Sequence, residues 1–448
     1  MGVLLACSLV GLVYAGLRPF LLAADLGLVL ASLTDLALTP SPARLALTRS
    51  VDERVGLGQE FERRVRVEPG RGAGLVLELR EEFAPALEVT ARDAGGASLA
   101  PPAGGGDPTG GPDRLRLPRA GAAVLRRRYR SLGRGVLHLG DLRLRLRGPL
   151  GLIERQARQG GTQAIAVEPA LLGLRRTLRL AASERWADLG ARRLRRKGGQ
   201  TEFESLRDYV RGDDPRLVDW KAFARHGRPI VRELQEERGQ ELIVLIDVGR
   251  RMGATSAEDD LAGWSKLDHA LDAGLELAAV ALEAGDRVGM AAFDDRLRVF
   301  VAPARGRRQL GRLREAHFDL QPTRREADLA RALRELSLQH RRRALLAVLS
   351  DLADPLSLPR QRRALRAGSR RHTIVLATLD DPSIRRAASR AGGAPPALRA
   401  AALESCAERA RGVRDLRRTG ARVLDSLPAD AAGPLLGAWL DERCGAAR

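Results

Sequence analysis

ELIVLID, residues 241–247, is a short apolar run that ends in an aspartate. Its consecutive apolar residues are typical of a strand that is buried on both faces of a sheet. Similar runs recur at residues 288–293, 344–349 and 373–379, and a run at 297–301 can return antiparallel to the first of these. Stretches with helical spacing lie at residues 265–283, 307–318, 326–339 and 395–418. This alternation predicts an open, doubly wound α/β domain over residues 241–448.

The segment before this domain, residues 202–233, reads EFESLRDYVRGDDPRLVDWKAFARHGRPIVRE. Asp213-Asp214-Pro215 predicts a turn that can open a short helix. Paired aspartates can act as acid, base or metal ligand, but neighbouring cations keep carboxylates ionised and hydrogen-bonded. We interpret the segment, within residues 171–240, as a structural ionic clamp onto the following domain. Its candidate residues are Glu202, Phe203, Leu206, Arg207, Asp208, Tyr209, Gly212, Asp213, Asp214, Arg216, Asp219, Trp220, Lys221 and Arg225.

These residues resemble the signature of a bacterial family, domain of unknown function 58 (DUF58). Its pattern is Glu-Phe, Leu-Arg-Asp-Tyr, Gly-Asp-Asp-x-Arg, Asp-Trp-Lys, Ala-Arg and Arg-Glu. An upstream Asp-Pro-Phe-Gly-Leu signature corresponds to Gly148–Leu152, where two of the five positions differ. The resemblance implies a membrane-anchored protein that ends in a von Willebrand factor A-like domain. It also implies an association with MoxR-type AAA+ ATPases.

Von Willebrand factor A domains hold Mg²⁺ at the carboxyl ends of their strands, through Asp-x-Ser-x-Ser, a later Thr-Asp and a further aspartate. The matching positions of this chain are Asp247, Gly249, Arg251, Ala327, Asp328 and Asp351. Three oxygen donors are therefore missing, although Mg²⁺ needs about six in near-octahedral geometry. Arg251 can form an ion pair with Asp247 in the place of the metal. The resemblance implies a degenerate site with no metal, cofactor or catalytic residue; the alternative is that Thr255 and Thr323 replace the lost ligands.

Residues 41–170 have a different pattern, in which apolar and charged residues alternate with a period of two. The clearest examples are residues 63–67, 75–79, 114–117 and 142–146. Such alternation is typical of half-buried strands, and about seven of them predict an immunoglobulin-like β-sandwich. We interpret the arginine-rich positions as a solvated sheet face, with a lipid-facing or partner-facing sheet as the alternative.

The chain begins with two apolar runs, Gly2–Leu17 and Phe20–Leu38, which Arg18-Pro19 separates. Each run is short, because ~16 helical residues span about 24 Å and a hydrocarbon core is about 30 Å thick. We favour a transmembrane hairpin over residues 1–38 rather than a signal peptide, because no basic segment comes first and a second apolar run follows. The arginines that follow, Arg44, Arg49, Arg54, Arg63 and Arg64, predict an inner-membrane protein with its soluble domains in the cytoplasm.

The formal net charge is +20, and only Lys197, Lys221 and Lys266 are lysines. Arginine enrichment of this kind indicates a GC-rich genome, and an aromatic content of 3% argues against single-strand nucleic-acid binding. The three cysteines, Cys7, Cys406 and Cys444, have neither a disulfide framework nor zinc spacing.

The expected function is that of a non-catalytic, membrane-anchored scaffold or adaptor. A metal-free von Willebrand factor A-like domain would be presented to a protein partner, and the resemblance implies a MoxR-type AAA+ ATPase. Two alternatives stay open: a metal-dependent or hydrolytic enzyme that uses the aspartates, and nucleic-acid binding through the basic surface. The sequence has no GxSxG, GxxxxGK[ST] or HExxH motif.

Overall fold

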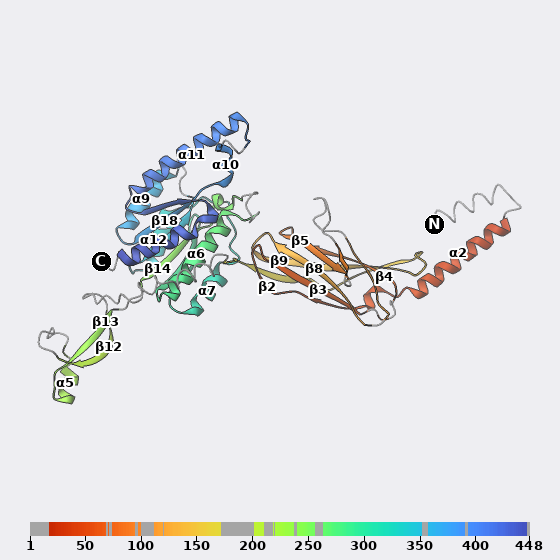
Figure 1. Ribbon diagram of the computed structural model, residues 1–448, viewed down its shortest axis with the longest axis horizontal. Coiled ribbons are helices and arrows are strands. Elements are labelled where there is room, and N and C mark those ends of the chain that lie inside the picture. The colour runs from red at the N-terminus through yellow and green to blue at the C-terminus, as the bar shows by residue number, and fades with distance from the viewer. Residues whose placement is uncertain are drawn as a thin grey trace. The chain divides into compact units, whose positions relative to one another are not determined.

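The chain forms two compact units, as shown in the computed structural model of Figure 1. The first unit comprises Met1–Ala170 with Asp260–Gly263, and the second comprises Leu171–Asp259 with Trp264–Arg448. The structure describes residues 18–68, 70, 74–94, 97–99, 112–119, 121–171, 201–209, 218, 220–236, 240–255, 263–351, 357–389 and 393–445.

The first unit opens with helix α2, Arg18–Leu38. Pro19 suits the first turn of a helix, since its missing N–H has no intrahelical partner there. An 18-residue window within Pro19–Arg44 has a mean hydropathy of 1.8, and 6% of that window is buried. Its 21 residues extend about 32 Å, which is enough to cross a bilayer, although a signal sequence has the same character. The helix is longer than the expected second run, and Gly2–Leu17 lies outside the described residues, so the hairpin stays a prediction.

Two sheets form the rest of this unit. Their strand orders are β1-β3-β8-β5-β6 and β2-β11-β9-β4-β7, with β10 paired to β9. All pairs are antiparallel except β2 with β11. The elements are the 3-10 helix η2 (Pro42–Arg44), β1 (Ala46–Ser50), β2 (Arg54–Gly56), β3 (Glu60–Glu68), β4 (Val76–Phe83), β5 (Leu87–Ala94), β6 (Ala97–Leu99), β7 (Asp113–Arg116), β8 (Ala123–Ser131), β9 (Gly135–Arg147), β10 (Glu154–Gln159) and β11 (Gln163–Glu168).

The core of this unit consists of the apolar positions of the alternating strands. Each of the four alternating stretches noted in the sequence lies in or overlaps a strand, namely β3, β4, β7 or β9. Val65 and Leu77 are examples of their fully buried side chains. The immunoglobulin-like assignment stays a prediction.

Two arginines of these strands are buried, which corrects the expectation that the arginines only line solvated faces. Arg63 and Arg127 are fully buried. Arg63 donates to Glu81, which also accepts from Tyr129 at 2.8 Å, and Arg127 Nε lies 2.8 Å from Asp113. The period of two places Arg63 on the same face as Val65, and a buried cation is tolerated when a carboxylate compensates it.

The main body of the second unit is a six-stranded sheet with the order β16-β15-β14-β17-β18-β19. The strands are parallel except β16, which returns antiparallel to β15 as the sequence predicts. The elements are β14 (Glu241–Asp247), η5 (Arg250–Gly253), α6 (Lys266–Glu283), β15 (Arg287–Phe293), β16 (Leu297–Ala304), α7 (Arg307–His317), α8 (Leu329–Gln339), β17 (Leu345–Ser350), α9 (Leu358–Ser369), β18 (Thr373–Leu379), α10 (Pro382–Ala388), α11 (Pro396–Arg417), β19 (Arg422–Ser426), η7 (Pro428–Asp430) and α12 (Ala432–Gly445).

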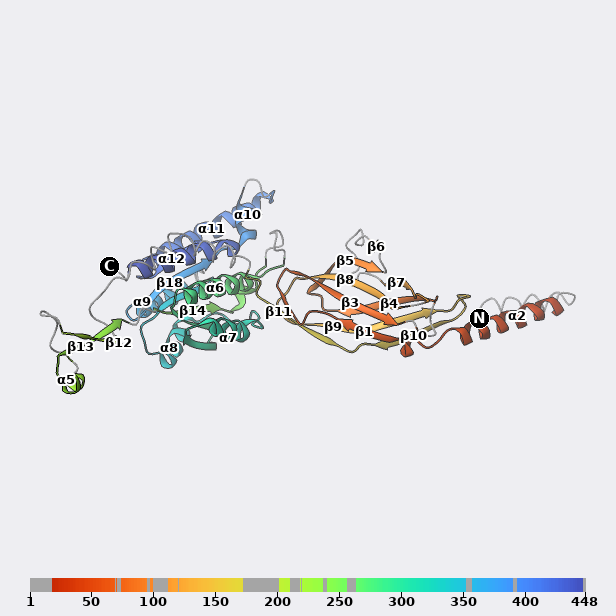
Figure 2. The ribbon, with the colours of Figure 1, turned by 60° about the horizontal axis from the view of Figure 1, so that its bottom comes forward.

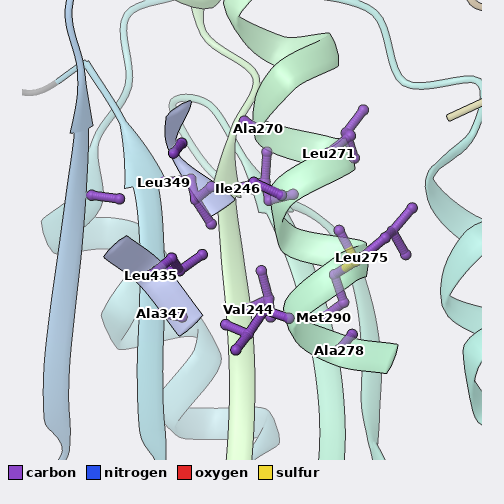
Figure 3. Packing of buried hydrophobic residues seen from close by; sticks show 14 of the residues in the cluster. Val244, Ile246, Ala270, Leu271, Leu275, Ala278, Met290, Ala347, Leu349 and Leu435 are labelled. Carbon is purple, nitrogen blue, oxygen red and sulfur yellow. The ribbon is translucent and has the colours of Figure 1, made fainter. Parts of the chain in front are cut away.

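Helices cover both faces of this sheet, and each face has its own core cluster. Residues of α6, α7 and α12 pack on one face with Val244 and Ile246, and Figure 3 shows this cluster. Residues of α8, α9 and α11 pack on the other face with Ile243 and Leu245. Burial on both faces explains why β14 is a continuous apolar run. Helix α6 approaches closely at Gly274, where a Cβ atom would lie 3.0 Å from Val244.

Candidate functional site

The candidate site lies at the carboxyl edge of the six-stranded sheet. Asp247 ends β14, and Asp351 directly follows the neighbouring strand β17. The amino end of α6, capped by Ser265, brings Lys266 to the same edge. In open parallel sheets this edge is where ligands bind.

The carboxylate of Asp247 is enclosed by protein groups. Its side chain is 2% exposed, Gly249 N donates to Oδ1 at 2.6 Å, and the hydroxyl of Ser350 donates to Oδ2. Burial raises the pKa of Asp247 to about 7, in spite of these two hydrogen bonds. Gly249 has little room for a side chain, because a Cβ atom would lie 2.9 Å from Asp247 Oδ1 and 3.1 Å from Arg325 O. A serine ligand at position 249 would therefore require the loop to move.

Asp351 is held by three cations. Lys266 Nζ lies 2.9 Å from Oδ2, Arg409 Nη1 lies 2.8 Å from Oδ1, and Arg251 Nε lies 3.4 Å from Oδ2. Burial works to raise the pKa of Asp351, but Lys266 and Arg409 outweigh it and hold the pKa below its usual value. Arg251 pairs here rather than with Asp247, which corrects the expectation from sequence.

The sequence analysis missed Lys266 and Arg409. Lys266 is only 4% exposed and also lies 3.6 Å from Asp381. Arg409, on α11, bridges Asp351 to Asp380 at 3.2 Å and Asp425 at 2.9 Å. One signal was present: a lysine among so many arginines marks a position where a compact ammonium is required.

Asp328, Ala327 and Thr323 belong to neighbouring interactions of the same edge. Asp328 caps α8 by accepting from Arg331 N at 3.1 Å, and it pairs with Arg360 at 2.7 Å. The carbonyl of Ala327 accepts from Gln361 at 3.4 Å. Thr323, a proposed substitute ligand, hydrogen-bonds to Asp294 through its side chain.

This donor set does not fit Mg²⁺. The ion prefers about six oxygen ligands, whereas an ammonium and a guanidinium occupy the oxygens of Asp351, and the oxygens of Asp247 accept two protein hydrogen bonds. Among the residues that the structure describes, no group of three or more His, Cys, Asp or Glu side chains is placed to hold a metal ion. A cavity of about 80 Å³ beside Asp351 is much smaller than the pockets of about 300–1,000 Å³ that hold substrates.

The motif segment forms a two-stranded antiparallel sheet with a short helix between its strands. The elements are β12 (Thr201–Asp208), α5 (Trp220–His226) and β13 (Ile230–Glu236), and Tyr209 N donates to Pro229 O at 2.9 Å. Glu202, Phe203, Leu206, Arg207 and Asp208 lie in β12, and Trp220, Lys221 and Arg225 lie in α5. Gly212, Asp213, Asp214, Arg216 and Asp219 lie outside the described residues, so the ionic clamp stays a prediction.

Trp220, one of the residues that we assign to the clamp, lies largely in solvent. Its side chain is 67% exposed, and its ring contacts the edge of Phe223 with centroids 6.0 Å apart.

The chain is similar to uncharacterized proteins of two mycobacteria. Mb1516 of Mycobacterium bovis and Rv1480 of Mycobacterium tuberculosis are each 29% identical over 187 residues, which cover 41% of this chain. The match spans 56% of the length of each relative. Among solved structures, the chain is similar to the ASH/PapD-like domain 7 of human CEP192, with 10% identity, a TM-score of 0.17, and coverage of 29% of this chain and 87% of that one. Residues 205–386, from β12 through α10, match the model of the family described as "Protein of unknown function DUF58".

Proposed function

We propose that this protein is a non-catalytic, membrane-anchored scaffold whose α/β unit presents its carboxyl edge to a protein partner. The observation that carries the proposal is the occupancy of Asp351 by Lys266 and Arg409. In a von Willebrand factor A-like domain a metal ion would compensate the negative charge at this edge. Here the two cations compensate it through internal ion pairs. The von Willebrand factor A-like assignment and the MoxR-type ATPase partner enter from the family resemblance.

The surface of this edge suits recognition by charge. Arg250, Arg325, Glu326 and Arg360 have side chains that are more than half exposed. They form solvated pairs, such as Arg250 with Glu326, which a partner can exchange for its own charges. Helix α2 supplies the membrane anchor, with the soluble units on the cytoplasmic side of the inner membrane.

The enzyme alternative draws on Asp247, since a pKa of about 7 suits a general acid or base. Against it, the carboxylate is buried and accepts hydrogen bonds from Gly249 and Ser350. The nucleic-acid alternative draws on the net charge of +20. A steep fall of DNA affinity with salt would favour it.

The first prediction concerns the partner. Full-length protein in detergent should bind a purified, nucleotide-free MoxR-type ATPase equally well with and without EDTA. Arg250→Glu combined with Arg325→Glu should weaken binding about tenfold or more, because both reverse exposed charges of the edge. The control is Arg307→Glu, the same charge reversal on an exposed side chain that follows β16 at the opposite edge. Equal affinities for all three proteins would reject this edge as the docking surface.

The second prediction concerns Mg²⁺. Calorimetric titration of the full-length protein should detect no stoichiometric site tighter than ~1 mM, about −4 kcal/mol. The reason is repulsion from Lys266, Arg251 and Arg409, which would surround a cation bound to Asp351. One-to-one binding that Asp247→Asn abolishes would show that the edge is a working metal site.

A further inference from the structure

The turn between β9 and β10 is fastened to the last part of α2 by one buried aspartate. Asp35 is fully buried, although it belongs to an otherwise exposed apolar helix. Its Oδ1 accepts from Leu150 N at 2.9 Å, and its Oδ2 accepts from Leu152 N at 2.9 Å and Ile153 N at 2.8 Å. Charge-assisted bonds to three backbone amides fix the position of the turn relative to the helix. Figure 2 shows α2 leaving the unit at the end where β10 lies.

The tip of this turn exposes two large apolar side chains. Leu150 is 56% exposed and Leu152 is 46% exposed. Leu36 and Leu38, at the end of α2, are exposed as well. Exposed leucines on this turn and on the helix end to which it is hydrogen-bonded are consistent with a surface that a partner or a membrane covers.

The strands that lead to the turn have an excess of positive charge on their outer face. Arg80, Arg143 and Arg158 lie in direct register across β4, β9 and β10. Nearer the turn, Arg145 and Arg147 share one carboxylate, Glu154, at 2.8 Å and 3.7 Å. Glu78 lies opposite Arg145 but pairs with Arg114, so among the described residues positive charge is in excess at the end of the sheet that Asp35 fastens to the helix. Apolar side chains next to excess positive charge are the composition of a membrane-interface element.

We propose that the turn Gly148–Ile153 is a membrane-interface element that binds anionic phospholipid. Leu150 and Leu152 enter the boundary between headgroups and acyl chains, and Arg145 and Arg147 bind the phosphate groups of the lipid. Asp35 is the positioning residue, because it holds the turn at the depth where α2 leaves the bilayer. The inference rests on the proposed function only in that α2 must cross the membrane.

The test uses nitroxide labels in the full-length chain, reconstituted in vesicles that contain phosphatidylglycerol and phosphatidylcholine. Cys7, Cys406 and Cys444 are first replaced by serine. Single cysteines are then placed at Leu152, at Val136 and at Leu26. Val136 is the matched control, because it is 42% exposed and lies about 36 Å from Arg147 at the other end of β9. Leu26, exposed in the middle of α2, reports on the anchor itself.

We expect the ratio of oxygen accessibility to nickel-chelate accessibility to be several-fold higher at Leu152 than at Val136. Equal ratios at these two positions, with a lipid-buried label at Leu26, would overturn the inference and leave the anchor intact. A nickel-accessible label at Leu26 would overturn the anchor and the inference with it.

A second arm tests the lipid charge. Arg145→Gln with Arg147→Gln should reduce the depth of the Leu152 label in phosphatidylglycerol vesicles and leave it unchanged in pure phosphatidylcholine. Arg64→Gln with Arg66→Gln, on exposed positions of the other sheet, is the control and should have no effect. An unchanged depth in both lipids would overturn the role of the two arginines.

Discussion

Replacing Asp351 with asparagine should lower the free energy of unfolding of the α/β unit by about 3–5 kcal/mol. The substitution keeps the shape of the side chain but removes the charge that compensates Lys266, which is buried, and part of the charge that compensates Arg409. Arg409 keeps Asp380 and Asp425, whereas Lys266 keeps one carboxylate among the described residues, Asp381 at 3.6 Å. Most of the cost should therefore come from a buried ammonium that has lost its nearest partner.

Urea unfolding of the full-length protein measures this cost, with the fluorescence of the buried Trp264 and Trp439 as the signal. Arg250→Gln is the matched control, since its pair with Glu326 lies on the same edge in solvent and should contribute at most ~1 kcal/mol. Lys266→Met should remove most of the additional cost in the double variant, because the two changes act on one ion pair. An Asp351→Asn cost no larger than that of the control would mean that water already compensates these charges.

The strands of the α/β unit were predictable because burial on both faces leaves a strong pattern. The run 241–247 and the run 373–379 coincide with β14 and β18. Helix α9 escaped the sequence analysis because only Gln361, Ala364 and Leu365 of its twelve residues are buried. A helix whose buried face is so narrow has little apolar periodicity to detect.

The partners of the candidate site could not be predicted, because they come from distant parts of the chain. Lys266 is 85 positions from Asp351, and Arg409 is 58 positions away. No local spacing encodes such pairs; the sheet topology brings them together. Counting metal-ligand positions therefore located the acidic residues of the edge and Arg251, but not Lys266 and Arg409.

Asp35, in the first unit, is another residue whose partners could not be predicted from the sequence. A Cβ atom on Gly148 would overlap the carboxylate of Asp35, so the turn leaves no room for a side chain at this position. The residues that Asp35 bonds lie 115 to 118 positions along the chain, so no local spacing encodes the contact.

Asp247→Asn should remove a pH dependence of stability that the buried carboxyl produces. Because the folded pKa of Asp247 is raised from 3.8 to about 7, the folded state holds a proton that the unfolded state has already lost. The contribution of Asp247 to the free energy of unfolding is fully present below about pH 4 and is lost as the pH rises through about 7. At about 1.4 kcal/mol for each tenfold change in proton affinity, the decline is up to ~4 kcal/mol. Asparagine can keep both hydrogen bonds, accepting from Gly249 N and donating to Ser350, with no charge to bury.

Urea unfolding of both proteins between about pH 4 and pH 8 gives the difference in their free energies of unfolding at each pH. The variant should be the more stable protein at the alkaline end and should lose its advantage toward the acid end. Asp286, whose pKa burial raises to about 6, and His372, whose pKa burial lowers to about 4, act with opposite signs but are common to both proteins. Asp286→Asn is the control, and its difference curve should level off about one pH unit earlier, because the raised pKa of Asp286 is that much lower. A difference curve for Asp247→Asn that is flat with pH would mean that Asp247 is ionised and solvated in the folded protein, which would return it to the candidates for a ligand or a catalytic group.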